Sequence, residues 1–144
     1  MILVDANLLL YAYHPRSEHH EASRVWLENI LSGAELVRFA WLTLWAFLRI
    51  STNPRVFERP LTAAEAEAAV AAWLASPVAG ILEPGDRHWD ILRSLLRRGQ
   101  AAGPLVMDAA LAALAVEHGA ILHTTDRDFS RFPGLRWTNP LAAR

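Results

Sequence analysis

The sequence predicts an α/β fold: a single-domain, three-layer α/β/α architecture with a short central parallel sheet. Short apolar runs, the first of them at Ile2–Val4, alternate along the chain with longer segments of helical periodicity. Such alternation favours a parallel sheet covered by helices on both faces. No linker, repeat or low-complexity segment divides residues 1–144, and 144 residues suffice for one domain with one sizeable core.

The first half of the chain supplies two strands and two helices. Residues 2–4 are predicted as a buried strand that ends at Asp5. Apolar residues at helical spacing predict a helix over about residues 18–31, which Gly33 ends. Residues 36–40 are expected to form a second strand. Residues 43–51 follow as a buried helix, closed by the turn residues Asn53 and Pro54.

The second half of the chain begins with a clear helix start. Thr62 and Glu65 form a capping-box pattern, which predicts an alanine-rich helix to about residue 75. Asp86 is expected to cap a helix that ends near Gly99. Another helix around Met107 ends at Gly119. Strands are expected at the remaining apolar runs, residues 80–82, 120–124 and, as an edge strand, 136–137.

Composition narrows the class of protein. The chain has no cysteine, which excludes disulfides, thiol catalysis and cysteine-bound zinc. No export signal is visible, and the most apolar run, residues 39–48, is about half of the ~20 residues that a membrane span needs. We therefore expect a cytoplasmic protein without a membrane contact. A net charge of −1 argues against binding nucleic acid by bulk charge alone.

Aspartates lie where the predicted fold brings strand ends together. Asp5 follows the first strand and Asp126 follows a late one, so both are expected at the carboxyl edge of the sheet, where ligands bind in such folds. Asp108 begins the helix before that late strand, and Asp128 lies beside Asp126. Clustered carboxylates repel one another, and a magnesium ion, which prefers oxygen ligands, relieves the repulsion. A metal held there can promote phosphodiester hydrolysis.

Each of these residues also has a purely structural interpretation. Asp108 can complement a helix N-terminus, and aspartates such as Asp126 and Asp128 are common in turns. Asp5 is harder to explain in this way, because an acid that closes an apolar strand is costly without a partner. Three histidines and six tryptophans are weaker signals. The histidines match no metal-ligand spacing, and the tryptophans are expected mainly in the core and at interfaces, although some can stack on bases. These three of the six histidines are His14, His19 and His20.

Taken together, these segments resemble PIN domains, and more narrowly the VapC toxins of bacterial toxin–antitoxin pairs. The similarity covers nearly the whole chain and rests on an ordered set of motifs rather than on any single one. The motifs are ILVDANLL at residues 2–9, FLRISTNPR at 47–55, MDAALAALA at 107–115, TTDRDF at 124–129, RFPGL at 131–135 and NPL at 139–141.

The resemblance implies an endoribonuclease and assigns roles to particular residues. Asp5 and Asp108 would be the principal Mg²⁺ ligands, with Mn²⁺ as an alternative metal, and Asp126 would complete the site beside Asp128. Polar groups that orient a ligand or a water would be Asn7 and Thr124. Arginines expected to contact RNA are Arg49 and Arg55. The family cuts RNA, commonly of the tRNA or rRNA class, is silenced by a VapB-type antitoxin, and usually forms homodimers.

One position departs from the family pattern. Many PIN nucleases carry a glutamate within the stretch that corresponds to residues 44–47, where this chain has Ala46, and residues 37–57 contain no acid. The site therefore lacks about one negative charge. Three explanations stay open: Asp128 substitutes, one metal suffices until RNA supplies further oxygens, or catalysis is weak. The alternative function is a PIN-like module that binds RNA or a protein without cutting.

Other functions of aspartate-bearing α/β folds fit less well. Receiver domains and phosphatases of the haloacid dehalogenase type rely on a lysine, and this chain has none. Those phosphatases also place a second aspartate two residues after the first, where this chain has Asn7. Dinucleotide binding requires a glycine-rich turn after the first strand, which is absent from the sequence.

Overall fold

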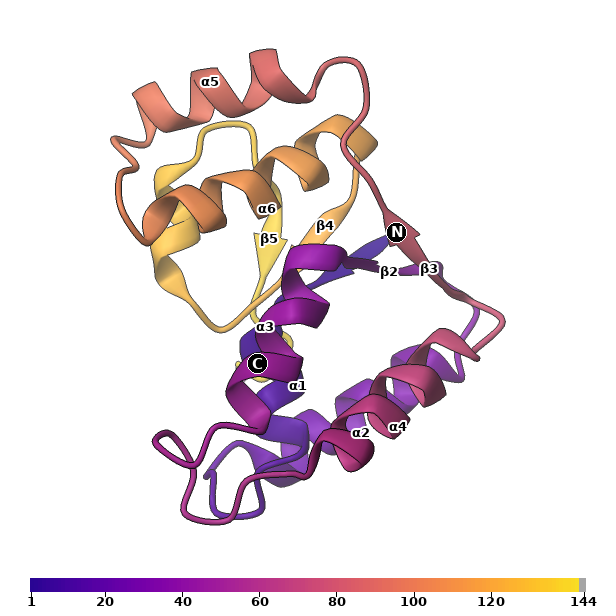
Figure 1. Ribbon diagram of the computed structural model, residues 1–144. Coiled ribbons are helices and arrows are strands. Elements are labelled where there is room, and N and C mark those ends of the chain that lie inside the picture. The colour runs from indigo at the N-terminus through magenta and orange to yellow at the C-terminus, as the bar shows by residue number, and fades with distance from the viewer. Residues whose placement is uncertain (143–144) are drawn as a thin grey trace.

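The computed structural model describes residues 1–142 and shows a five-stranded, fully parallel sheet with helices on both sides (Figure 1). The strands are β1 (Ile2–Val4), β2 (Val37–Ala40), β3 (Ala79–Leu82), β4 (Ile121–His123) and β5 (Trp137–Thr138). Their order across the sheet is β3-β2-β1-β4-β5. The predicted α/β class and parallel sheet are confirmed.

The helices complete the outer layers. They are α1 (Ala6–Ala12), α2 (His20–Leu31), α3 (Trp41–Ser51), α4 (Ala63–Leu74), α5 (His88–Arg98) and α6 (Leu105–His118), followed by a short 3₁₀ helix, η1 (Arg127–Arg131). None of the helices in the described part of the chain has the length and apolar character that crossing a membrane requires.

Strand β1 separates two hydrophobic cores because its side chains alternate between the faces of the sheet. Leu3 packs with α5, α6 and the segment after β4, whereas Ile2 and Val4 pack with α1, α2, α3 and α4. Figure 1 shows this division, with α5 and α6 on one side of the strands and α2 and α4 on the other. The three-layer arrangement therefore follows from a fully buried central strand.

Local signals explain some of the helix boundaries. The capping box is present at α4: Thr62 Oγ1 accepts from the Glu65 amide at 3.1 Å, and Glu65 Oε1 accepts from the Thr62 amide at 3.0 Å. Gly119 ends α6 in the left-handed conformation, with φ of 67°, which glycine adopts without strain. At α5 the prediction was wrong, because the capping position is Arg87, not Asp86, and no side chain caps that helix.

Helix α1 was not anticipated from the sequence. It begins immediately after β1, with Asp5 as its N-cap, and buries Leu8, Leu9 and Ala12. Its seven residues are too few for a convincing periodic pattern. The helix matters for the site, because its N-terminus places Asp5 at the carboxyl edge of the sheet.

Candidate metal centre

All strands run in the same direction, but the order in which they are added across the sheet reverses between β1 and β4. Strands β2 and β3 follow on one side of β1, and β4 and β5 lie on the other. Beyond the carboxyl ends of such a strand pair lies the usual ligand site of an open parallel sheet. Asp5 follows β1 directly, and Thr124 follows β4 directly. The backbone joins them, because the Asp5 amide donates to the His123 carbonyl at 3.1 Å.

Both carboxylate oxygens of Asp5 have hydrogen-bond donors. Oδ1 accepts from the Ala6 amide at 2.8 Å, and Oδ2 accepts from Thr124 Oγ1 at 2.7 Å. Thr124 is fully buried, and its hydroxyl also accepts from the Asp126 amide at 3.0 Å. One threonine side chain therefore connects the strand ends and fixes the carboxylate of Asp5.

Asp126 and Asp128 lie in the turn after β4, at the start of η1. Asp126 Oδ1 accepts from the Asp128 amide at 2.8 Å and caps η1, so part of its role is structural, as the turn interpretation expected. Asn7 reaches the same turn from α1, and its Nδ2 donates to Thr125 Oγ1 at 2.8 Å. The Asn7 Oδ1 atom is buried without a hydrogen-bond partner.

Asp108 lies in the first turn of α6, where the negative charges of the other three aspartates act on its carboxyl group. Its pKa is raised to about 6, chiefly by burial and then by the negative charges of the three acids, with Arg131 acting in the opposite direction. The three acids are Asp5, Asp126 and Asp128. The structure thus brings together the four aspartates that the sequence singled out, and Asp128 is the most exposed of them.

Burial also raises the pKa of Asp5, and the Asp126 charge adds to this effect. The hydrogen bonds from Thr124 and Ala6 lower this pKa, but they do not cancel the cost of burial. Two neighbouring acids are therefore held in surroundings that disfavour their charged forms. A divalent cation would reverse that balance, since its charge favours the ionised carboxylates.

The donor set fits a hard, water-bearing cation. Within residues 1–142, no three histidine, aspartate or glutamate side chains are placed to surround a metal ion by themselves. Mg²⁺ commonly binds through one or two carboxylates and keeps waters and substrate phosphate oxygens as its remaining ligands. The oxygen donors that would hold it are Asp5 and Asp108, with Asp126 nearby.

A hollow of about 510 Å³ opens beside these acids. Asp5 and Asp108 line it together with residues from α3, among them Thr43, Ala46 and Arg49. Ala46 therefore lines the hollow with Asp5 and Asp108, and it contributes only a methyl group there. Of the two arginines expected to contact RNA, Arg49 lines the hollow, whereas Arg55 lies in the exposed turn after α3 and is not among its lining residues.

Some residues at the site carried no usable sequence signal. Trp45 and Met107 line the hollow although both are largely exposed, at 62% and 53%. Arg131, at the end of η1, lowers the pKa of Asp108 and donates to the Gly99 carbonyl at 3.0 Å. Its distance in sequence from Asp108 conceals this role, and only the packing of η1 against α5 and α6 reveals it.

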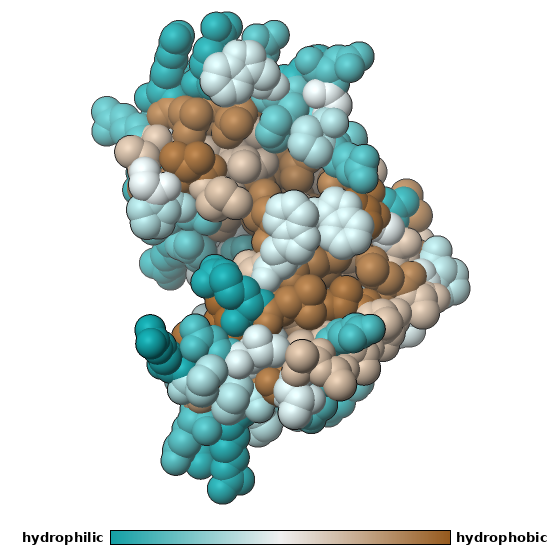
Figure 2. All heavy atoms as spheres, in the orientation of Figure 1, coloured by the Kyte–Doolittle hydropathy of each residue, from teal (hydrophilic) through white to brown (hydrophobic). Residues whose placement is uncertain are grey.

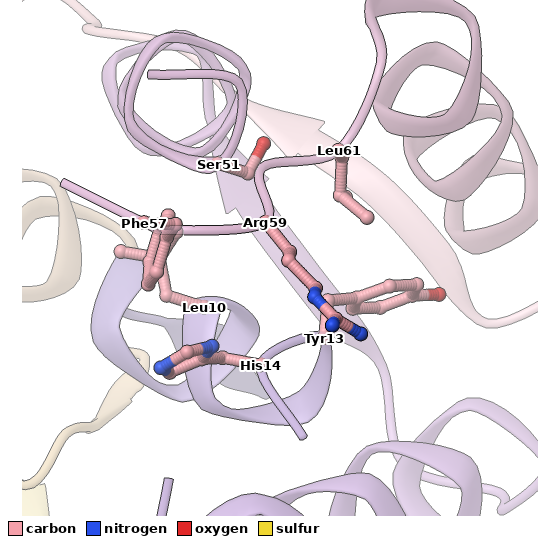
Figure 3. A pocket seen from close by; sticks show the side chains of 7 residues that line it. All are labelled: Leu10, Tyr13, His14, Ser51, Phe57, Arg59 and Leu61. Atoms are coloured by element: carbon pink, nitrogen blue, oxygen red, sulfur yellow. The ribbon is translucent and has the colours of Figure 1, made fainter. Parts of the chain in front are cut away.

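A second hollow, of about 570 Å³, lies at the opposite end of α1. Its lining residues include Tyr13, His14, Phe57 and Arg59, and Figure 3 shows the Arg59 side chain extending toward Tyr13. His14 packs on Phe57 with ring centroids 4.5 Å apart, whereas His19 packs on Tyr11. The histidines thus take separate packing roles, and within residues 1–142 they form no metal-binding group.

Comparison with known proteins identifies the family. The PIN domain profile matches residues 2–135. Ribonuclease VapC37 of Mycobacterium tuberculosis is 50% identical over 142 residues, covering 99% of each chain. Ribonuclease VapC33 of the same species is 40% identical over 98% of this chain and 99% of its own. The chain belongs to the VapC ribonucleases of the PIN-domain family.

Solved structures of VapC proteins share the fold. VapC20 of M. tuberculosis, described as a toxin that cleaves the sarcin–ricin loop, aligns with a TM-score of 0.64 and 23% identity, covering 94% of this chain and 99% of its own. VapBC2 of Rickettsia felis, bound to a promoter DNA fragment, aligns with a TM-score of 0.66 and 16% identity over 96% and 98%. At these identities the agreement concerns the VapC fold.

Proposed function

We propose that this VapC-family protein is a magnesium-dependent endoribonuclease that hydrolyses RNA phosphodiester bonds. The observation that carries the proposal is that Asp5 and Asp108 line one hollow where β1, β4 and α6 meet, and burial there raises the pKa of both acids. Folding places these acids together at an electrostatic cost, as metal sites and catalytic sites do. Family membership supports the same reaction.

Different residues would bind the metal, bind the RNA and keep the site in place. Asp5, fixed by Thr124 and the Ala6 amide, and Asp108 would hold the metal, with Asp126 completing the acidic group. Bound Mg²⁺ would supply an activated water and stabilise negative charge on the phosphate. Arg49, at the rim of the same hollow, would bind an RNA phosphate. Asn7 and Thr124 would keep the acidic turn in place.

Magnesium-dependent cleavage of RNA tests the assignment. We expect Asp5→Asn and Asp108→Asn each to lose more than about 100-fold of the activity, because loss of a group that merely orients a ligand already costs 10- to 100-fold. Both changes keep side-chain size and remove a charge. Metal-dependent cleavage that persists in both variants would contradict the proposal.

Ala46 supports one second candidate, a PIN-like module that binds RNA or protein with little or no cleavage. The hollow lacks the carboxylate expected at that position, which lowers the negative charge available to a metal. Such a module would retain RNA affinity in Asp5→Asn and Asp108→Asn, and the unaltered protein would not cleave at any magnesium concentration. Cleavage by the unaltered protein, lost in both variants, separates the two functions.

The proposed partners follow from the relatives. We propose that the toxin acts on an RNA of the tRNA or rRNA class in the cytoplasm, forms a homodimer and is silenced by a VapB-type antitoxin. VapBC complexes are among the solved structures that share the fold, including one from Salmonella typhimurium bound to DNA. Co-expression with the product of a short neighbouring gene should abolish toxicity, and toxicity unaffected by any neighbouring gene product would contradict this pairing.

A further inference from the structure

Two tryptophans stand out on the surface of α3. Trp41 and Trp45 are 44% and 62% exposed, and their rings lie nearly parallel, with centroids 6.5 Å apart and an interplanar angle of 23°. Trp45 follows Trp41 by one helical turn, so both project from the same side of the helix. Two adjacent exposed indoles form an apolar surface of the kind that marks a binding site.

This tryptophan pair lies directly beside the acidic hollow. Trp45 and Leu42 line that hollow together with Asp5 and Asp108, and both also line a neighbouring hollow of about 410 Å³. The floor of the neighbouring hollow is apolar, and its lining residues include Trp41, Leu82, Pro84 and Leu114. Figure 2 shows apolar side chains gathered in the hollowed middle of this face, over and beside α3. The two hollows therefore form one continuous depression.

The charged residues that line this depression differ between its two ends. Arg49 follows Trp45 by one further turn and lines the acidic hollow, so the helix presents two rings and then a guanidinium on one side. The neighbouring hollow carries one charged lining residue, Glu83. Its carboxylate disfavours a phosphate there and can accept hydrogen bonds from the amino groups of a base.

We propose that the Trp41–Trp45 pair binds an unpaired nucleobase of the RNA beside the phosphate that is cut. This inference rests on the ribonuclease function proposed above and adds a substrate-binding subsite to it. Unstacked bases bind by stacking on aromatic side chains, and the flanking phosphates bind to arginine. The depression leads from Glu83 past the two indoles to Arg49 and the acids, an order of groups that suits a base and its phosphate and favours RNA over a protein partner as its occupant.

Binding of a fluorescently labelled single-stranded RNA in EDTA tests the subsite without cleavage. We expect Trp45→Ala and Trp41→Ala to weaken binding by about 10- to 100-fold, the effect of losing one base–aromatic stack. Trp45→Phe should retain much of the affinity, because the flat ring remains. The control is Trp89→Ala, since Trp89 is also 62% exposed but lies on α5 and lines neither hollow.

The same variants separate the inference from its rivals. In magnesium, the loss in Trp45→Ala should appear as a raised KM, while a fully paired duplex of the same sequence binds equally to the variant and the unaltered protein. If the tryptophan variants bind single strands normally and sedimentation shows a smaller particle, the surface joins copies of the chain and the inference is wrong.

The inference and the proposed function can also fail separately. Cleavage by the unaltered protein with normal binding by Trp41→Ala and Trp45→Ala overturns the subsite alone. Binding that depends on the tryptophans without cleavage at any magnesium concentration supports the subsite and overturns the nuclease function. A circular-dichroism melt of each variant, with Trp45→Phe as the conservative reference, shows whether a loss of binding comes from unfolding.

Discussion

Helix α1 connects two hollows of similar size, about 510 Å³ at its beginning and about 570 Å³ at its end. At the beginning, Asp5 and Asp108 line one hollow, and both have raised pKa values. At the end, both acids that line the hollow have partners: Glu58 forms an ion pair with Arg16, and Glu65 accepts a hydrogen bond from the Thr62 amide at 3.0 Å. Size therefore does not distinguish a functional site here, whereas uncompensated charge does.

The largest expected effect concerns the pH dependence of Mg²⁺ binding at the acidic hollow. The pKa of Asp108 lies at about 6 without metal, so protons compete with the metal below that pH. Affinity should fall about tenfold per pH unit from pH 6 downward, measured by titration calorimetry. In Asp108→Asn binding should be weak, and the pH dependence that remains should come from Asp5, whose pKa is also raised by burial. A flat profile in the unaltered protein would show that Asp108 is not a ligand.

Adding an acid at residue 46 should increase the difference in Mg²⁺ affinity between the two hollows. Ala46→Glu adds a carboxylate beside Asp5 and Asp108, which should raise Mg²⁺ affinity on the order of tenfold, because another negative charge lies near the metal. Ala46→Gln has nearly the same size without the charge and serves as the matched control. Equal affinities in the two variants would mean that residue 46 does not reach the metal.

Stability without metal should respond to pH through Asp108. Its folded-state pKa is raised from 3.8 to about 6, so the stabilising contribution of the protonated acid is complete below pH 4 and is lost as the pH rises through 6. At pH 7, Asp108→Asn should be more stable by about 1 kcal/mol after allowance for solvent screening, or ~3 °C in Tm. Thermal melts at pH 4 and 7 check this, because the difference should vanish at pH 4.

The smallest effect is expected at the far end of α1. Arg59→Ala and His14→Ala should change cleavage by less than about 2-fold and leave Mg²⁺ affinity unchanged, because their hollow contains no uncompensated acid. Stability should change by about 0.5 kcal/mol or less in Arg59→Ala, as for most exposed positions. Cleavage kinetics and thermal melts on the same samples measure both effects. A large loss of cleavage with an unchanged Tm would assign a function to the second hollow.

The sequence by itself determined the layered fold and its acidic edge. Alternating strands and helices predicted the parallel sheet, and the capping box of Thr62 and Glu65 fixed the start of α4. Asp5 was identifiable because an acid that ends a buried strand needs a partner. These signals are local, since a side-chain pattern over a few residues decides strand, cap or turn.

Only the tertiary structure decided which distant groups meet. Three contacts join segments that lie far apart in the chain: Thr124 bonds to Asp5, Arg131 opposes the acids that act on Asp108, and Trp45 lines the hollow of Asp5 and Asp108. Such contacts depend on strand order and on how α3, α6 and η1 pack, which no local pattern encodes. The pKa of Asp108 likewise follows from burial and neighbouring charge, and both exist only once the chain has folded.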